Sequence, residues 1–323
     1  IGRNKYSVAV DLRTEEGQEL ARDLIGEADV LVENFRPGAL EKWGLDPLKL
    51  RETNQGLIVA RMSGYGQTGP YADRPGFGLI GEGFGGLRGI TGEPDRMPSR
   101  VGISIGDTLA ASYGAMGILA ALHHRDKTGD GQIIDVALYE SVLQVMESYV
   151  ADYSTSGFMR QRTGAILPKI APSNVYPCKD GEFLIGANQD PIFRRLCDAM
   201  GQPELATDAR YATHLARGEH QAELDGIISD WTRTLTVAEL EKLLLKNAVP
   251  SGKIYTAADM VSDPHYAARE AIVTVDDPEL GPVKMQNTFP KFSATPGSIR
   301  KQAPRSVGED TAAVLERWLG RPA

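Results

Sequence analysis

Disulfides, sulfur-based metal sites and long apolar runs are what this chain of 323 residues lacks. It has two cysteines, Cys178 and Cys197, and their spacing fits neither a disulfide framework nor a zinc site. The longest apolar stretches, such as residues 108–122, are short and rich in Gly and Ala, so we expect no membrane span. No secretion signal is visible. These features together predict a reducing, cytoplasmic setting.

Positive charge and catalytic histidines are also scarce. There are 35 Lys and Arg against 43 Asp and Glu, and the net charge of −8 argues against nucleic acid as a general partner. It leaves room for one local basic pocket for a small anion. His123 and His124 are adjacent at the end of an expected helix, where they do not share a face. We therefore expect no metal site and no Ser-His-Asp or Cys-His arrangement.

Strands and helices alternate in the first half of the chain. This alternation predicts a parallel sheet with helices on both faces. The expected order is a strand at 6–12, a helix at 15–27, a strand at 29–34, short helices within 38–53, strands at 56–63 and 131–138, and helices at 107–125 and 138–156.

A glycine-rich region, residues 64–106, interrupts this pattern and is expected to be mostly loop close to a ligand. It contains "GFGLIG" at 76–81, which matches G-x-G-x-x-G. The segment before it reads as a turn rather than a strand, and the nearby acid, Asp95, lies in another loop. We therefore interpret the match as accidental and expect no dinucleotide site.

The second half predicts a different organisation. We expect a smaller α+β domain at 170–285, a large α/β domain at 1–165, and a C-terminal segment at 286–323 that returns to the large domain. The elements expected in the second half are a hairpin at 174–187, helices at 191–200 and 222–247, two strands near 271–288, and a final helix at 308–319.

Basic residues follow the first two expected strands. Arg13 comes just after the first, and Arg36 and Lys42 come after the second. Ligands of open α/β sheets gather at the carboxyl ends of strands, and cations there suit phosphates. Solvated surface charge is the alternative.

Asp107 stands at the start of a helix built from small residues. Aspartate is a preferred helix N-cap, so capping is one interpretation. The glycine-rich loop before it favours another interpretation, because a substrate can come close to backbone that lacks side chains. The helix N-terminus would keep the Asp107 carboxylate charged and therefore nucleophilic. Glu140 and Glu147 are rival carboxylates, seven residues apart on one expected helix, and we expect them to be solvated or paired.

Five blocks in the sequence resemble the family III CoA-transferases, in order and over the whole chain. The family shares its fold with α-methylacyl-CoA racemase. The resemblance implies a Rossmann-like α/β large domain with a parallel sheet, a smaller α+β domain and two chains interlocked as a homodimer. The blocks read "ADVLVENFRPGALEKWGL", "SGYGQTGPYADRPGF", "IGDTLAASYGAMGILAAL", "KTGDGQIIDVALYES" and "VGEDTAAVL".

The resemblance also implies roles for particular residues. It places the nucleophilic aspartate on Asp107. Asn34 and Lys42 would hold the nucleotide end of CoA, and Arg13 would hold a phosphate. The full set of implied CoA contacts is Val10, Arg13, Asn34, Phe35, Arg36, Lys42, Pro75, Gly76, Phe77 and Gly78.

Transfer of CoA from an acyl-CoA to a small carboxylic acid is the implied reaction, through an aspartyl anhydride and an aspartyl-CoA thioester. It requires no permanently bound cofactor. The racemase branch pairs the aspartate with a histidine where this chain has Phe77, so racemisation is the poorer fit. The family's opening strand and helix have no counterpart before Ile1. We therefore expect either a missing N-terminal segment or a catalytically incomplete member.

Overall fold

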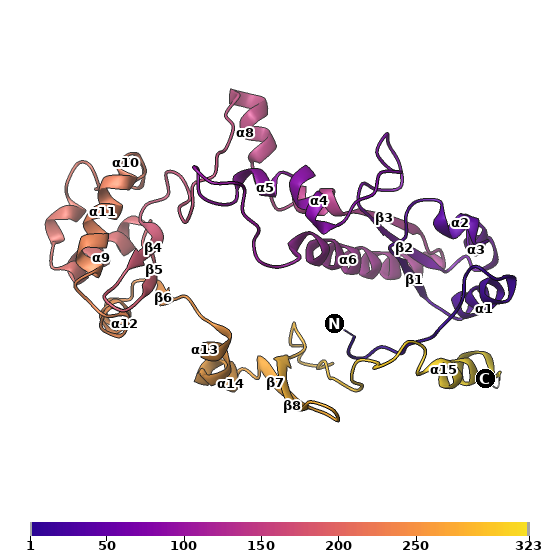
Figure 1. Cartoon of the computed structure of the whole chain (residues 1–323). Coiled ribbons are helices and arrows are strands. Elements are labelled where there is room, and N and C mark those ends of the chain that lie inside the picture. Colours follow the sequence, from indigo (N-terminus) through magenta and orange to yellow (C-terminus); the bar gives the residue numbers. More distant parts are fainter. Residues whose placement is uncertain (1, 322–323) are drawn as a thin grey trace.

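The chain forms an open loop in the computed structural model, which describes residues 2–321 (Figure 1). A parallel sheet with its helices lies on one side of this loop, and a unit of helices around an antiparallel sheet lies on the other. One connection passes through α8 (Tyr149–Ser156), and the other returns through α13 (Ala257–Ser262) and α14 (Pro264–Ala268).

The parallel sheet contains β1 (Val30–Glu33), β2 (Ile58–Ser63) and β3 (Ile133–Ala137), in that order. Its central strand begins with an uninterrupted buried run, Ile58 to Ala60, without the alternation of a half-exposed strand. Such runs are typical of strands that are covered on both faces. The expected strands 29–34, 56–63 and 131–138 are confirmed.

Three short helices follow the expected positions beside β1. Thr14 caps α1 (Glu15–Gly26), its hydroxyl oxygen accepting from the Gly17 N–H at 3.0 Å. α2 (Ala39–Lys42) and α3 (Pro47–Thr53) come next. Their leucines form a core with β2, made of Leu40, Leu45, Leu50, Leu57 and Val59.

The longest helix, α6 (Ile105–Thr128), packs along β2 and β3. Small residues permit the close approach, since a Cβ on Gly114 would lie 2.2 Å from the Met62 methyl carbon. By length and composition α6 could also cross a membrane, so the expectation that the apolar stretches are too short for this is wrong. Packing on the sheet accounts for the small residues.

The expected helix 138–156 is wrong as a single element. The structure has α7 (Leu138–Leu143) and then α8 after a break, and Glu147 lies in the break with φ 53°. A non-glycine residue with positive φ cannot continue a right-handed helix. Glu140 and Glu147 therefore do not share one helical face. α4 (Gly78–Phe84) and α5 (Leu87–Ile90) are short helices within the glycine-rich region.

The second unit has a dense core around β4 (Ser173–Pro177), β5 (Glu182–Gly186) and β6 (Ser251–Lys253), which are antiparallel. α9 (Asp190–Met200), α10 (His214–Glu219), α11 (Gln221–Thr232) and α12 (Val237–Lys246) surround this sheet. The expected helix 222–247 is thus two helices. Thr236 starts the second with a capping box to Glu239, which sets a helix boundary inside the expected span.

The C-terminal segment returns to the first unit after the hairpin of β7 (Ile272–Asp277) and β8 (Gly281–Gln286). α15 (Thr311–Leu319) lies beside α1, and Arg321 pairs with Asp23 at 2.7 Å. The expected final helix begins three residues later than predicted.

The strand expected at 6–12 does not form. Its alternation of apolar and polar residues is present, but its N–H groups bond to side chains at the start of α15 rather than to a strand. Ser7 N–H donates to Asp310 at 2.8 Å, and Ala9 N–H donates to Thr311 at 3.0 Å. The segment is extended because it lies along the returning C-terminal segment.

Candidate active site

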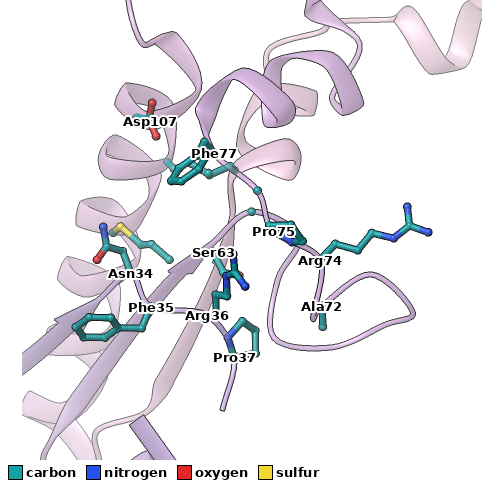
Figure 2. Close-up of a pocket in the computed structure, with 15 residues that line it drawn as sticks. Asn34, Phe35, Arg36, Pro37, Ser63, Ala72, Arg74, Pro75, Phe77 and Asp107 are labelled. Atoms are coloured by element: carbon teal, nitrogen blue, oxygen red, sulfur yellow. The ribbon is translucent and has the colours of Figure 1, made fainter. Parts of the chain in front are cut away.

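A cavity of about 300 Å³ opens at the carboxyl ends of the three parallel strands (Figure 2). Asn34 follows β1, Ser63 ends β2 and Leu138 follows β3. Ligand sites of open α/β sheets lie in this position. The lining residues are Asn34, Phe35, Arg36, Pro37, Met62, Ser63, Gly64, Ala72, Arg74, Pro75, Gly76, Phe77, Asp107, Ala110 and Leu138.

The loop from β2 to α4 folds back on itself through two glycines. A Cβ on Gly64 would lie 2.9 Å from the Gly76 Cα, and one on Gly76 would lie 3.1 Å from the Gly64 Cα. The two backbones can meet only because neither residue has a side chain. This contact brings Phe77 to the cavity, where its ring is 80% exposed.

Asp107 lies in the first turn of α6, whose N-cap is Ser104. The interpretation of Asp107 as the N-cap is therefore wrong, because the helix begins at Ile105 and Asp107 is its third residue. A carboxylate in the first turn still interacts favourably with the helix N-terminus. The side chain is exposed and faces the cavity (Figure 2).

Gly78 provides the space beside Asp107. A Cβ built on Gly78 would lie 2.2 Å from the Asp107 Oδ2 atom and 2.8 Å from its carboxyl carbon. The nucleophile expected from the sequence therefore packs directly against the first residue of α4. Any side chain at position 78 would displace this carboxylate.

A buried ion-pair network fixes the turn after β1. Arg61 on β2 donates to Glu33 at 2.7 Å and to Glu41 at 2.8 Å, and Glu33 also accepts from the Phe35 N–H at 2.7 Å. Burial alone would lower the pKa of Arg61, but its hydrogen bonds to the two carboxylates raise it above the ordinary value. The network holds Asn34, Phe35 and Arg36 at the cavity.

Aromatic rings cluster beside the loop that joins β2 to α4. Tyr65, Tyr71, Phe84 and Tyr139 contact one another, with ring centroids 4.9 to 6.3 Å apart. The Arg74 guanidinium lies 3.6 Å above the Tyr71 ring, and Figure 2 shows its side chain extending away from Asp107.

The structure brings most of the implied site residues together. Gly78 does not line the cavity but lies directly against the Asp107 carboxylate. The implied residues that line the cavity are Asn34, Phe35, Arg36, Pro75, Gly76, Phe77 and Asp107. Lys42 lines an adjoining hollow with Arg36, Trp43 and Asp73.

Val10 and Arg13 line neither of these hollows. The Arg13 guanidinium pairs with Asp11 at 2.8 Å and, through hydrogen bonds, lowers the pKa of Asp11 to about 2. The pair uses the Nε and Nη2 atoms of Arg13, whose side chain is 84% exposed.

The rival carboxylates have other partners. Glu140 accepts from the Tyr139 hydroxyl at 3.1 Å, and Glu147 pairs with Arg160 at 3.2 Å. Among residues 2–321, no group of three or more His, Cys, Asp or Glu side chains could hold a metal ion.

Several lining residues are not identified by sequence reasoning. Met62, Ser63 and Leu138 lie at strand ends, so strand boundaries alone could have indicated them. Ala72 and Ala110 carry no chemical signal. Ala110 lies one helical turn from Asp107, but that spacing has meaning only once the helix is known to border the cavity.

The chemistry of this cavity is that of a single exposed carboxylate. Asp107 is the acid among its described lining residues, which include no histidine, cysteine or lysine. Such a site can form an acyl intermediate on the carboxylate. Racemisation needs a second proton-transfer group, and Phe77 cannot supply one.

The chain is similar to known proteins along nearly all of its length. The family description that matches residues 1–311 is CoA-transferase family III. A succinyl-CoA–D-citramalate CoA-transferase from Chloroflexus aurantiacus is 54% identical over 321 residues, which span 99% of this chain and 80% of the relative. A succinate–glutarate CoA-transferase from Agrobacterium fabrum is 38% identical over 313 residues, covering 97% and 78%.

A solved structure has the same fold. The crystal structure of a CaiB/BaiF family protein from Brucella suis superimposes with a TM-score of 0.84 at 37% identity, covering 98% of this chain and 82% of that one.

Proposed function

Since the chain belongs to CoA-transferase family III, we propose that it moves CoA from succinyl-CoA to a second dicarboxylic acid, with Asp107 as the nucleophile. The chain is a CoA-transferase by family and by its 54% identity to an enzyme of that activity. The nucleophile, the donor and the acceptor belong to the proposal.

The proposed reaction has two halves. An Asp107 carboxylate oxygen attacks the thioester carbon, CoA thiolate leaves, and a mixed anhydride forms. The thiolate then attacks the Asp107 carboxyl carbon, which releases the donor acid and leaves an aspartyl-CoA thioester. The acceptor carboxylate repeats these steps in reverse order, so the products are a new acyl-CoA and a free Asp107. Covalent catalysis divides one difficult exchange into easier steps.

The observation that carries the proposal is the position of Asp107. It is the acid of a cavity at the carboxyl ends of the strands, and the glycine at position 78 leaves its carboxylate accessible. We propose that CoA binds along the cavity and the adjoining hollow, which are lined by Asn34, Arg36 and Lys42. Arginine and lysine there would neutralise its phosphates.

The choice of acids follows the relatives. One relative is named for succinyl-CoA and D-citramalate, and another for succinate and glutarate. Each of these acids carries two carboxylates. We propose succinyl-CoA as the donor and citramalate as the first acceptor to test.

Asp107→Asn tests the nucleophile. We expect CoA transfer to fall by at least about a thousandfold, because an amide cannot form the anhydride. Asp126→Asn, on the exposed end of the same helix, is the matched control and should retain wild-type activity. Hydroxylamine should trap the acyl-enzyme on the peptide containing Asp107 in the wild type alone. Full activity of Asp107→Asn would exclude the proposal.

We also propose that the active form is a homodimer of interlocked chains. The chain exposes 19998 Å², whereas a compact protein of 35.0 kDa exposes about 13,000 Å². Apolar side chains contribute to the excess, including Met116 and Leu119 on α6, which are 63% and 67% exposed. Sedimentation should give twice the chain mass, and a stable, active monomer would contradict this proposal.

A further inference from the structure

The segment from the last residue of β1 to the last residue of α2 contains two acids and two cations, which differ in their partners. Glu33 and Glu41 both bind Arg61. Within the part of the chain that the structure describes, neither Arg36 nor Lys42 has an ion pair or a side-chain hydrogen bond. Arg36 lines the cavity (Figure 2) and the adjoining hollow, and Lys42 lines that hollow. The acids are therefore occupied, and both cations can bind an anion there.

Arg61 on β2 joins the two ends of this segment. Its Nε atom donates to the Glu33 Oε1 atom at 2.7 Å, and its Nη1 and Nη2 atoms donate to the two carboxylate oxygens of Glu41 at 2.8 and 3.4 Å. The other Glu33 oxygen accepts from the Phe35 N–H at 2.7 Å. One guanidinium thus fixes both the turn after β1 and α2, which its planar fork of donors permits and a lysine ammonium does not.

The two carboxylates differ in burial. The Arg61 and Glu33 side chains are 9% and 2% exposed, so removal of either would leave an uncompensated charge in the interior. The Glu41 side chain is 35% exposed, and its removal leaves Arg61 paired with Glu33. The Phe35 and Trp43 rings also join the turn to α2, edge to face with centroids 5.0 Å apart. Without Glu41, α2 should therefore shift rather than unfold.

We infer that Arg61 is a positioning residue for CoA binding, which holds Arg36 and Lys42 in one fixed arrangement and keeps the two acids from neutralising them. The inference rests on the proposed function, which places CoA along the cavity and the hollow. Arg61 lines neither of them, so it acts through the two carboxylates. CoA carries its negative charge on the phosphates of its nucleotide end, and its pantetheine end is uncharged. The effect of Arg61 should therefore appear in phosphate binding and not in the reaction at Asp107.

Glu41→Ala tests the inference, because alanine preserves the helix while Arg61 loses its attachment to α2. The KM for succinyl-CoA and the dissociation constant of free CoA, measured by calorimetry, should both rise about three- to tenfold, as expected for a partly exposed charged hydrogen bond. The kcat should change less than about twofold. Electrostatics alone predicts the opposite sign, since removal of an acid would strengthen the binding of an anion. Glu41→Gln, which keeps one hydrogen bond to Arg61, should lie between Glu41→Ala and the wild type.

Glu52→Ala is the matched control, because it removes the same charge from an exposed position of α3 that does not contact Arg61. It should leave KM, kcat and CoA affinity unaffected. Arg61→Lys should weaken CoA binding as Glu41→Ala does, and the two changes combined should add little, because both remove one interaction. The melting temperature of each variant shows whether it folds.

Succinyl-pantetheine, which has the thioester but no phosphate, separates phosphate binding from the reaction. Its kcat/KM should change less than about twofold in Glu41→Ala. Equal losses with succinyl-CoA and succinyl-pantetheine would indicate a general structural effect and overturn the inference. An unchanged or lower KM for succinyl-CoA in Glu41→Ala would overturn it as well.

Failure of the proposed function gives a different result. It would appear as a wild-type enzyme without CoA transfer or as an active Asp107→Asn variant. An active wild type whose Glu41→Ala variant keeps the wild-type affinity for free CoA overturns only the role of Arg61.

Discussion

The two sides of the molecule are stabilised in different ways. The core around β4, β5 and β6 contains buried aromatic rings from Tyr176, Phe183, Phe193 and Tyr211. The core beneath β1 and β2 consists of leucines and one valine, and the nearby cavity depends on glycines in contact with backbone and with Asp107. The unit around β4, β5 and β6 gains stability from large, closely packed side chains. In the parallel-sheet unit, small residues let backbone segments and Asp107 approach one another closely. The candidate site lies in the parallel-sheet unit.

The largest expected effect is a loss of stability when one of the buried aromatic rings is removed. Phe183→Ala removes a fully buried ring on β5 and should cost about 3–5 kcal/mol of unfolding free energy. Leu184→Ala is the matched control, since Leu184 is the next residue on the strand, faces outward and is 43% exposed. It should cost less than about 1 kcal/mol. Denaturant unfolding measures both, and equal losses would show that the core does not concentrate stability at Phe183.

The next largest effect is a loss of activity, which should follow when the space beside Asp107 is filled. Gly78→Ala places a Cβ 2.2 Å from the Asp107 Oδ2 atom. The carboxylate must then move by about 1 Å, which should lower kcat about a hundredfold. Gly83→Ala on the same helix meets nothing within 4 Å, and should keep activity while gaining up to about 1 kcal/mol. A fully active Gly78→Ala would contradict the role assigned to Gly78.

The smallest expected effect concerns the pH dependence of stability in the unit around β4, β5 and β6. Asp190 accepts from Arg217, which is fully buried, and this hydrogen bond lowers the pKa of Asp190. A carboxyl group with a lowered folded pKa stabilises the fold above its unfolded pKa of about 3.9, and this contribution is lost as the pH falls through the folded value. Asp190 is 43% exposed, so solvent screens the pair.

Asp190→Asn should therefore cost about 1 kcal/mol at pH 7, and the difference from wild type should narrow below about pH 4. Asp230→Asn, in an exposed pair with Arg233, is the control and should change stability by less than about 0.5 kcal/mol. Unfolding curves recorded from pH 3 to pH 8 measure both, and a constant difference for Asp190→Asn would contradict the linkage.

Much of the fold could be predicted because its signals are local. The strands expected at 29–34, 56–63 and 131–138 form β1, β2 and β3, and the helix expected at 15–27 forms α1. The errors arose where distant segments compete with local pattern. Residues 6–12 alternate like a strand but pair with the start of α15, and the break at Glu147 divides one apparent helix into two.

The sequence by itself determined the family and the position of Asp107 at the start of a helix of small residues, because both are encoded in short contiguous blocks. Tertiary structure decided that Asp107 is not the helix cap, that Gly78 gives its carboxylate room, and that Arg13 lies outside the cavity. It also joined Glu33 and Glu41 through Arg61. These relations join residues far apart in the chain or depend on where a helix begins, and neither appears in local sequence.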